Sequence, residues 1–232
     1  MIRPLPWHRL PSQPVTEALA GLRWQTENGA PPSAGIAALM IYVALNFVAH
    51  TAPTDDGADG VVAEATYTEL SEMTDLSRSL IAHGVKRLTA LSLITASGSA
   101  QKRRYWITGP HKPWFKLPCQ AIVKQGVIDP FKTFTLRSKH ELHALKLYLY
   151  LASCRDNRTQ FSMVSYETIH ARTGISERDI RRAISLLVSS GLLENVDREF
   201  SRTLKINEAN KYYLTGSRAL FDGAAVTGAV AA

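Results

Sequence analysis

Two short groups of basic side chains are the residues of this chain best suited to chemistry with a partner. Arg178, Arg181 and Arg182 are three and four positions apart, a spacing that puts them on one face of a helix. Residues 102–104 form a second group, Lys-Arg-Arg, within a polar segment. A planar guanidinium can bond two neighbouring acceptors at once, such as O6 and N7 of guanine, whereas an ammonium supplies mainly charge. Both groups therefore favour an anionic partner.

The distribution of charge along the chain points the same way. The 232 residues carry a formal net charge of +7 and have a sequence pI near 9.5. Residues 67–140 hold 12 Lys and Arg against 4 Asp and Glu, whereas residues 1–66 hold 3 against 6. A concentration of positive charge in the middle of the chain favours nucleic acid as the partner over a general effect on solubility.

Signatures of an enzyme or of a cofactor site are absent from the sequence. There is no G-x-x-x-x-G-K-[ST] phosphate loop and no G-x-G-x-x-G segment after a predicted strand. The segment KHELHALK has His140 and His143 three positions apart, not in the HExxH spacing of a zinc helix, so we expect only the exposed start of a helix. We therefore predict a protein that is not an enzyme and has no cofactor and no metal site.

The composition indicates a cytoplasmic, nucleoid-associated protein with no membrane partner. The longest apolar run, residues 36–49, contains Asn46 and is shorter than the roughly 20 residues of a membrane-spanning helix. The first residues contain four prolines and no apolar core of a secretory signal. We expect Cys119 and Cys154 to be reduced packing residues.

The sequence also contains a long internal similarity. PWHRLPSQ begins at Pro6 and PWFKLPCQ begins at Pro113, 107 positions later. Residues 67–94 align with residues 166–193 without a gap, and although only six of these 28 positions are identical, the apolar positions coincide. We infer an internal duplication with a first domain at 1–109, a second at 110–215 and a flexible tail at 216–232.

Each unit has the same predicted order of elements. A buried helix, about 35–50 or 138–154, is followed by a short strand and by two helices around a tight turn. In the second unit Ser176 is the expected N-cap of a helix that ends at Gly191, and Asp179 is expected to stabilise the start of that helix through its dipole. A strand, a basic loop (97–104 or 197–202) and a second strand, residues 204–206 in the second unit, then close a hairpin.

This order and one motif resemble a known family, the winged helix-turn-helix proteins. From Thr173 to Leu193 the pattern T-G-I-S-x-R-x-I-x-x-A-I-x-x-L, followed by G-L-L, is similar to that around the recognition helix of bacterial winged-helix regulators and of plasmid or phage replication proteins. The first unit departs from it at Asp75, where glycine is usual, and at Gly84, where alanine is usual. The resemblance implies a mainly α fold with small β-hairpins (α+β), made of two winged helix-turn-helix domains.

In that fold the recognition helix lies in the major groove and the wing contacts phosphate. We expect Ile81, Val85 and Leu88 of the first recognition helix, and Ile180, Ile184 and Leu187 of the second, to be buried. The polar residues between them then form the outer face of each helix. The predicted DNA-binding residues are Arg78, Ser79, His83, Lys86 and Arg87 on the first helix, Lys102, Arg103 and Arg104 in its wing, Arg178, Arg181, Arg182 and Ser185 on the second helix, and Arg198 and Arg202 in the second wing.

These observations predict a sequence-specific protein for double-stranded DNA, first of all a transcriptional regulator with two recognition helices. One alternative is a plasmid or phage replication initiator that binds origin repeats, and another is a winged-helix scaffold for protein interaction. The protein can also form a homodimer, or use one of its two units to bind another protein; the sequence is compatible with both. For the repeated Pro-Trp motif we expect an extended lead-in that packs against its own unit; the alternative is a partner-binding motif used twice.

Overall fold

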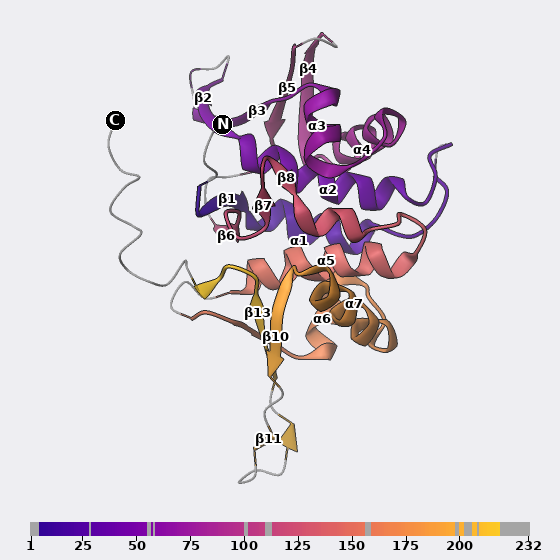
Figure 1. Cartoon of the computed structure of the whole chain (residues 1–232), viewed down its shortest axis with the longest axis vertical. Helices are drawn as coiled ribbons and strands as arrows, with labels where there is room; N and C mark the ends of the chain where they lie inside the picture. Colours follow the sequence, from indigo (N-terminus) through magenta and orange to yellow (C-terminus); the bar gives the residue numbers. More distant parts are fainter. Residues whose placement is uncertain are drawn as a thin grey trace.

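Two apolar helices form the centre of the molecule, as the sequence predicts. They are α2 (Ala34–Val48) and α5 (Lys139–Cys154), and they lie side by side in the computed structural model (Figure 1). Nearly every residue of α2 is buried, Asn46 included. Helix α5 starts at a capping box: the Glu141 carboxylate accepts a hydrogen bond from the backbone N–H of Ser138, and the Ser138 hydroxyl accepts one from the backbone N–H of His140. The two helices belong to one continuous hydrophobic core.

The structure describes most of the chain. The described residues are 5–27, 29–54, 57, 59–99, 102–109, 113–155, 159–197, 200–201, 206–207 and 209–218. Most of the predicted tail, 216–232, therefore lies outside them. Within the described residues, no helix is both long enough and apolar enough to cross a membrane.

The first unit surrounds α2 with a helix pair and a four-stranded antiparallel sheet of order β2-β3-β5-β4. Its elements after α2 are β2 (His50–Pro53), β3 (Asp59–Glu64), α3 (Tyr67–Thr74), α4 (Arg78–Ala90), β4 (Ile94–Ser99) and β5 (Lys102–Ile107). Strands β4 and β5 form the predicted hairpin that follows the second helix of the pair.

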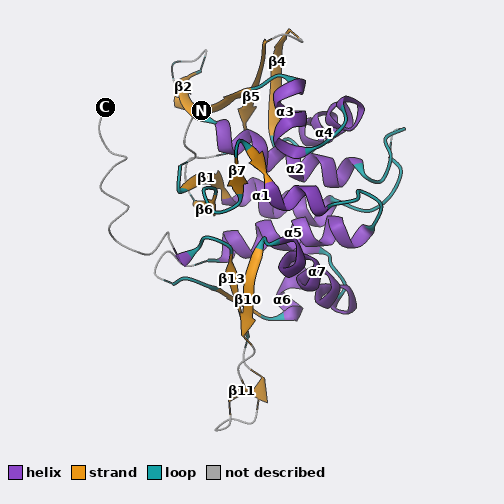
Figure 2. Cartoon of the chain, viewed as in Figure 1, coloured by secondary structure: helices purple, strands orange, loops and turns teal. Residues whose placement is uncertain are grey.

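The second unit repeats this plan around α5. Its elements after α5 are β9 (Ser162–Val164), α6 (Tyr166–Thr173), α7 (Glu177–Ser190), β10 (Leu193–Asp197), β11 (Phe200–Ser201), β12 (Ile206–Asn207) and β13 (Asn210–Leu214). The sheet has the order β10-β13-β9, and β11 pairs with β12 farther out along the wing (Figure 2). The predicted return strand, residues 204–206, is corrected where it is described: Ile206 pairs with Ser201, and β13 takes the place beside β10, so the wing is longer. Leu204 and Lys205 lie outside the described residues.

A β-hairpin and a short helix precede α5 in the second unit. Strands β7 (Val123–Lys124) and β8 (Val127–Ile128) are joined by Gln125 and Gly126, both at positive φ, 52° and 83°, as a tight two-residue turn of type I′ requires. The 3₁₀ helix η1 (Asp129–Thr133) follows. With small antiparallel sheets around helix pairs, the predicted mixed, mainly helical fold class is confirmed.

The two Pro-Trp segments pair with each other. They form β1 (Trp7–Pro11) and β6 (Trp114–Pro118), antiparallel, with Trp7 opposite Pro118, Arg9 opposite Lys116 and Pro11 opposite Trp114. Because equivalent positions of the repeat exchange places across this pair, its register has local two-fold symmetry. Each lead-in also packs against its own unit as expected, β1 on α2 and β6 on α5, but the sequence did not predict that the two lead-ins pair with each other.

Aromatic and basic side chains reinforce this strand pair. The rings of Trp7 and Trp114 are stacked, with centroids 5.9 Å apart and planes 2° from parallel. The Arg9 guanidinium lies 4.7 Å from the Trp114 ring centroid, and the Lys116 ammonium 4.6 Å from that of Trp7. Arg9 and Lys116 are like charges directly opposite each other, and the cation–π contacts offset their repulsion. Duplication itself, and the domain limits 1–109 and 110–215, stay predictions from the sequence.

A buried lysine fastens helix α1 (Ser12–Gly21) of the first unit to α5 of the second. The Lys146 side chain is 2% exposed, and its ammonium donates a 2.9 Å hydrogen bond to the carbonyl oxygen of Leu22, at the end of α1. Burial, with a smaller contribution from the charge of Arg23, lowers the pKa of Lys146 to about 8. The charged form of this lysine is thus disfavoured in the folded chain.

We predict that Lys146→Met removes an alkaline rise in stability. The pKa of Lys146 is about 8 in the folded chain and 10.5 in the unfolded chain, so between these pH values the unfolded chain binds more protons than the folded chain. The contribution of Lys146 to the free energy of unfolding therefore increases with pH across this window, by about 3 kcal/mol. Denaturant unfolding across this window measures it. The exposed Lys124→Met is the control and should keep the rise; an identical rise in Lys146→Met would contradict the assignment.

Candidate nucleic-acid interface

Both units contain a helix pair joined by a turn of the same backbone shape. Helix α3 is capped at its C-terminal end by Asp75 with φ 59°, and α6 by Gly174 with φ 69°, so both residues adopt the left-handed backbone conformation. Aspartate is one of the few residues other than glycine that tolerate this conformation. Ser77 then caps α4 by accepting a hydrogen bond from the N–H of Leu80. The substitution of aspartate for the usual turn glycine therefore preserves the turn.

Helix α4 presents most of its predicted outer residues to solvent. Arg78, Ser79 and Lys86 are exposed, His83 is half-buried, and Ile81 and Leu88 on the opposite face are fully buried. The Arg78 guanidinium donates to the hydroxyl of Thr68 on α3 at 2.8 Å. This contact bridges the two helices of the pair and holds Arg78 at the start of α4.

Arg87 has a different environment from the other predicted residues of α4. Its side chain is 16% exposed and forms an ion pair with Glu27 at 2.5 Å. Hydrogen bonding to Arg87 lowers the pKa of Glu27. The pair ties α4 to the segment before α2. Arg87 is therefore less available to a partner than Lys86, and the exposed Arg23 on the neighbouring segment is a basic residue that sequence reasoning missed.

The first wing is basic but internally bonded. Arg103 donates a 2.8 Å hydrogen bond to the hydroxyl of Tyr67, and its guanidinium lies 4.9 Å from the centroid of that ring. Arg104 pairs with Glu64 at 2.7 Å, and both side chains are well exposed. An exposed pair of this kind contributes little to stability, so a phosphate can take the place of the carboxylate at small cost. Lys102 begins β5, and its side chain is outside the description.

Helix α7 has the sharpest division between a buried and an exposed face. Ile180, Ala183 and Leu187 are fully buried. The residues predicted for its outer face, Arg178, Arg181, Arg182 and Ser185, are all exposed. The Ser185 hydroxyl donates to the carbonyl oxygen of Arg181, one turn earlier. Arg198 and Arg202 of the second wing lie outside the described residues.

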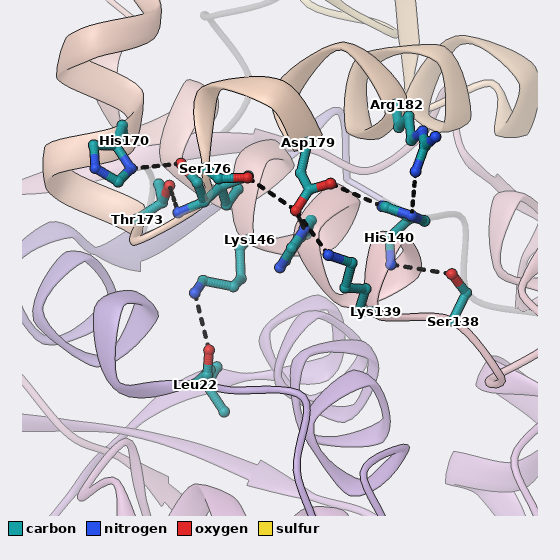
Figure 3. Close-up of polar contacts among 12 residues, drawn as sticks. Leu22, Ser138, Lys139, His140, Lys146, His170, Thr173, Ser176, Asp179 and Arg182 are labelled. Carbon is teal, nitrogen blue, oxygen red and sulfur yellow. Dashed lines mark hydrogen bonds and ion pairs between the residues drawn. The ribbon is translucent and has the colours of Figure 1, made fainter.

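Asp179 joins α7 to the start of α5. Its side chain is 8% exposed, and one oxygen accepts hydrogen bonds from the Lys139 ammonium at 3.0 Å and the Ser176 hydroxyl at 2.9 Å (Figure 3). Burial acts to raise the pKa of Asp179, but these two bonds outweigh it and lower the pKa. The role predicted for Asp179, stabilising the helix start, is thus incomplete, because its partners include a residue of another helix.

Two histidines of α5 face the same carboxylate. The Nδ1 atoms of His140 and His143 each lie 3.8 Å from an oxygen of Asp179. Burial, together with the nearby charge of Lys146, lowers the pKa of His143 to about 4, so this imidazole is neutral at pH 7. Sequence reasoning found the two histidines but not the partner, which lies 36 or more positions away in the chain.

Among the described residues, His140, His143 and Asp179 are the one group whose ligand atoms, all within 4.8 Å of each other, suit a metal ion. Two imidazoles and a carboxylate are ligands that zinc accepts. The Lys139 ammonium, however, already neutralises the Asp179 carboxylate from within the chain. This arrangement favours a tie between α5 and α7 through the Lys139–Asp179 pair, and the absence of a metal site stays a prediction.

Comparisons with known proteins agree with this architecture. Residues 142–193 match the family described as a helix-turn-helix domain, a span that runs from α5 to the start of β10. A search of curated proteins found no match. Among solved structures, the chain resembles the Pi initiator protein in complex with iteron DNA, with a TM-score of 0.52 and 13% identity. The similarity covers 92% of this chain and 99% of that one. The predicted winged helix-turn-helix fold is thereby confirmed.

Proposed function

We propose that this chain binds double-stranded DNA through both helix-turn-helix units, with α4 and α7 as the recognition helices. The observation that carries the proposal is the outer face of α7, where three arginines are exposed above a fully buried apolar face. Among the described residues, none of these three arginines forms an ion pair with an acidic side chain. A helix with three such arginines on one exposed face is suited to base edges and phosphates.

The arrangement of the units supports binding by a single chain. Helices α4 and α7 lie toward the same side of the molecule, on either flank of the central pair α2 and α5, and the two wings extend in opposite directions (Figure 1). One chain can then present two recognition helices as a dimer of single units would, to successive major grooves about one helical turn apart. A homodimer is not required for this mode and stays a prediction.

Between the two DNA-binding roles, the comparison favours replication initiation. The protein of similar fold is an initiator, and it was solved on iteron DNA. The similarity extends over almost all of both chains, so it includes the arrangement of the two units and not only one helix-turn-helix. We therefore propose a replication initiator that binds repeated origin sites, with a transcriptional regulator as the second candidate.

Selection of bound fragments from the source genome and its plasmids tests this function. An initiator should enrich fragments with repeated sites at an origin and promote local melting there, whereas a regulator should enrich promoters without melting. A protein-interaction scaffold should show no salt-dependent DNA binding at all. Failure to enrich any duplex would overturn the proposal.

A further inference from the structure

One recognition-helix arginine is held from outside its own helix-turn-helix. An Nη atom of Arg182 on α7 lies 3.3 Å from Nε2 of His140 on α5, although the two residues are 42 positions apart (Figure 3). Within the described residues the guanidinium groups of Arg178 and Arg181, on the same exposed face, have no hydrogen-bond partner. Arg182 therefore differs from its neighbours in having a fixed direction before any partner binds.

The environment of His140 favours one of its two nitrogens as the acceptor of that hydrogen bond. A neutral imidazole carries one N–H, and a carboxylate facing one nitrogen favours the proton on that side. Nδ1 of His140 is buried and lies 3.8 Å from an oxygen of Asp179, so the carboxylate acts on this nitrogen through its charge and not through a hydrogen bond. Nε2 is then the free acceptor, which is what a guanidinium requires, because it can only donate. The charge of Asp179 thus favours the form of His140 that can accept from Arg182, and this acceptor orients Arg182.

We propose that His140 is a positioning residue for DNA recognition: it orients Arg182 and thereby sets the base preference that Arg182 confers. This inference rests on the proposed function. A long exposed side chain loses rotamer freedom when it binds, and a side chain that is already oriented loses less. The gain applies only to the base pair that Arg182 contacts, so it affects specificity at one position more than overall affinity.

The test is selection from a library of random-sequence DNA duplexes with the full chain and its variants. Arg182→Ala should lose preference at one or two base pairs by about tenfold. His140→Leu, which removes the acceptor, should weaken preference at those same base pairs by about three- to tenfold. The double variant should match Arg182→Ala alone, because the histidine acts through the arginine. His140→Gln, whose amide oxygen can accept from Arg182, should restore the preference.

The control is Lys124→Ala, which removes an exposed charge that pairs with Asp129 and has no contact with Asp179, His140 or Arg182. It should lower affinity for all duplexes alike and leave the base preference unchanged. Thermal unfolding shows whether each variant is folded. If His140→Leu is not folded, His140→Gln is used in its place, and a loss of base preference in His140→Gln contradicts the proposal. The inference is overturned, while the proposed function stands, if His140→Leu keeps the base preference of the unmodified chain. It is also overturned if His140→Leu changes the preference at base pairs other than those affected by Arg182→Ala. If the unmodified chain enriches no sequence, the proposed function fails and the inference fails with it.

Discussion

Replacing Arg178, Arg181 and Arg182 together by alanine should abolish selective DNA binding while the chain stays folded. All three side chains are exposed, so their removal takes no packing from the core. Each good pairing of an arginine with a base contributes about 1–3 kcal/mol of discrimination. We expect preference for a selected site over random duplex to fall by at least about a hundredfold, measured by competition binding at fixed salt.

A matched variant separates this effect from a general loss of charge. Lys124, Lys132 and Arg218 are exposed residues outside the two helix-turn-helix pairs. Their replacement by alanine also removes three positive charges, and it should weaken binding to all duplexes without changing the sequence preference. Equal preference in the two triple variants would contradict the assignment of α7 as a recognition helix.

Gly84→Leu should strongly destabilise the fold, although glycine inside a helix suggests a site that tolerates a larger side chain. A Cβ at this position would lie 2.5 Å from Cδ1 of Ile41 and 3.1 Å from backbone atoms of Ala37 and Ala38. The isoleucine end can turn aside, but the backbone of α2 cannot move without disturbing the centre of the core. We expect a loss of about 3 kcal/mol or more in the free energy of unfolding, measured with denaturant.

Two further variants define the cause of this loss. Gly84→Ala gains about 1 kcal/mol in helix propensity but meets the same backbone atoms, so it should be destabilised by less than Gly84→Leu. Ala82→Leu, on the exposed face of the same helix, should change stability by no more than about 0.5 kcal/mol. Wild-type stability in Gly84→Leu would show that α2 and α4 are not in close contact.

Local features of the fold were predictable because they depend on neighbours in the chain. The apolar spacing of Ile81, Val85 and Leu88 determines which face of α4 is buried, and the structure buries all three. The turn between the helices follows from a residue that tolerates positive φ, and Asp75 adopts it as Gly174 does. The outer faces of α4 and α7 follow from the same periodicity, which is why most of the predicted site residues are exposed.

Contacts between distant segments were not predictable from these patterns. Nothing in the periodicity of α4 indicates that Arg87 pairs with Glu27, because ion-pair partners far apart in sequence leave no local signal. The same holds for Asp179 with Lys139 and for the pairing of β1 with β6. The equal spacing of Pro, Trp and Leu in the two lead-ins was a signal for the last of these, since self-complementary segments can pair about a two-fold axis.

The central claim is that one chain uses both recognition helices on DNA, and a hydroxyl-radical footprint at a selected site tests it most directly. The chain should be studied at a concentration where it is a single copy. We predict protection in two successive major grooves, about one helical turn apart, for a total of about two turns. Protection of a single groove by one chain, with the second groove protected only after another copy binds, would contradict the claim.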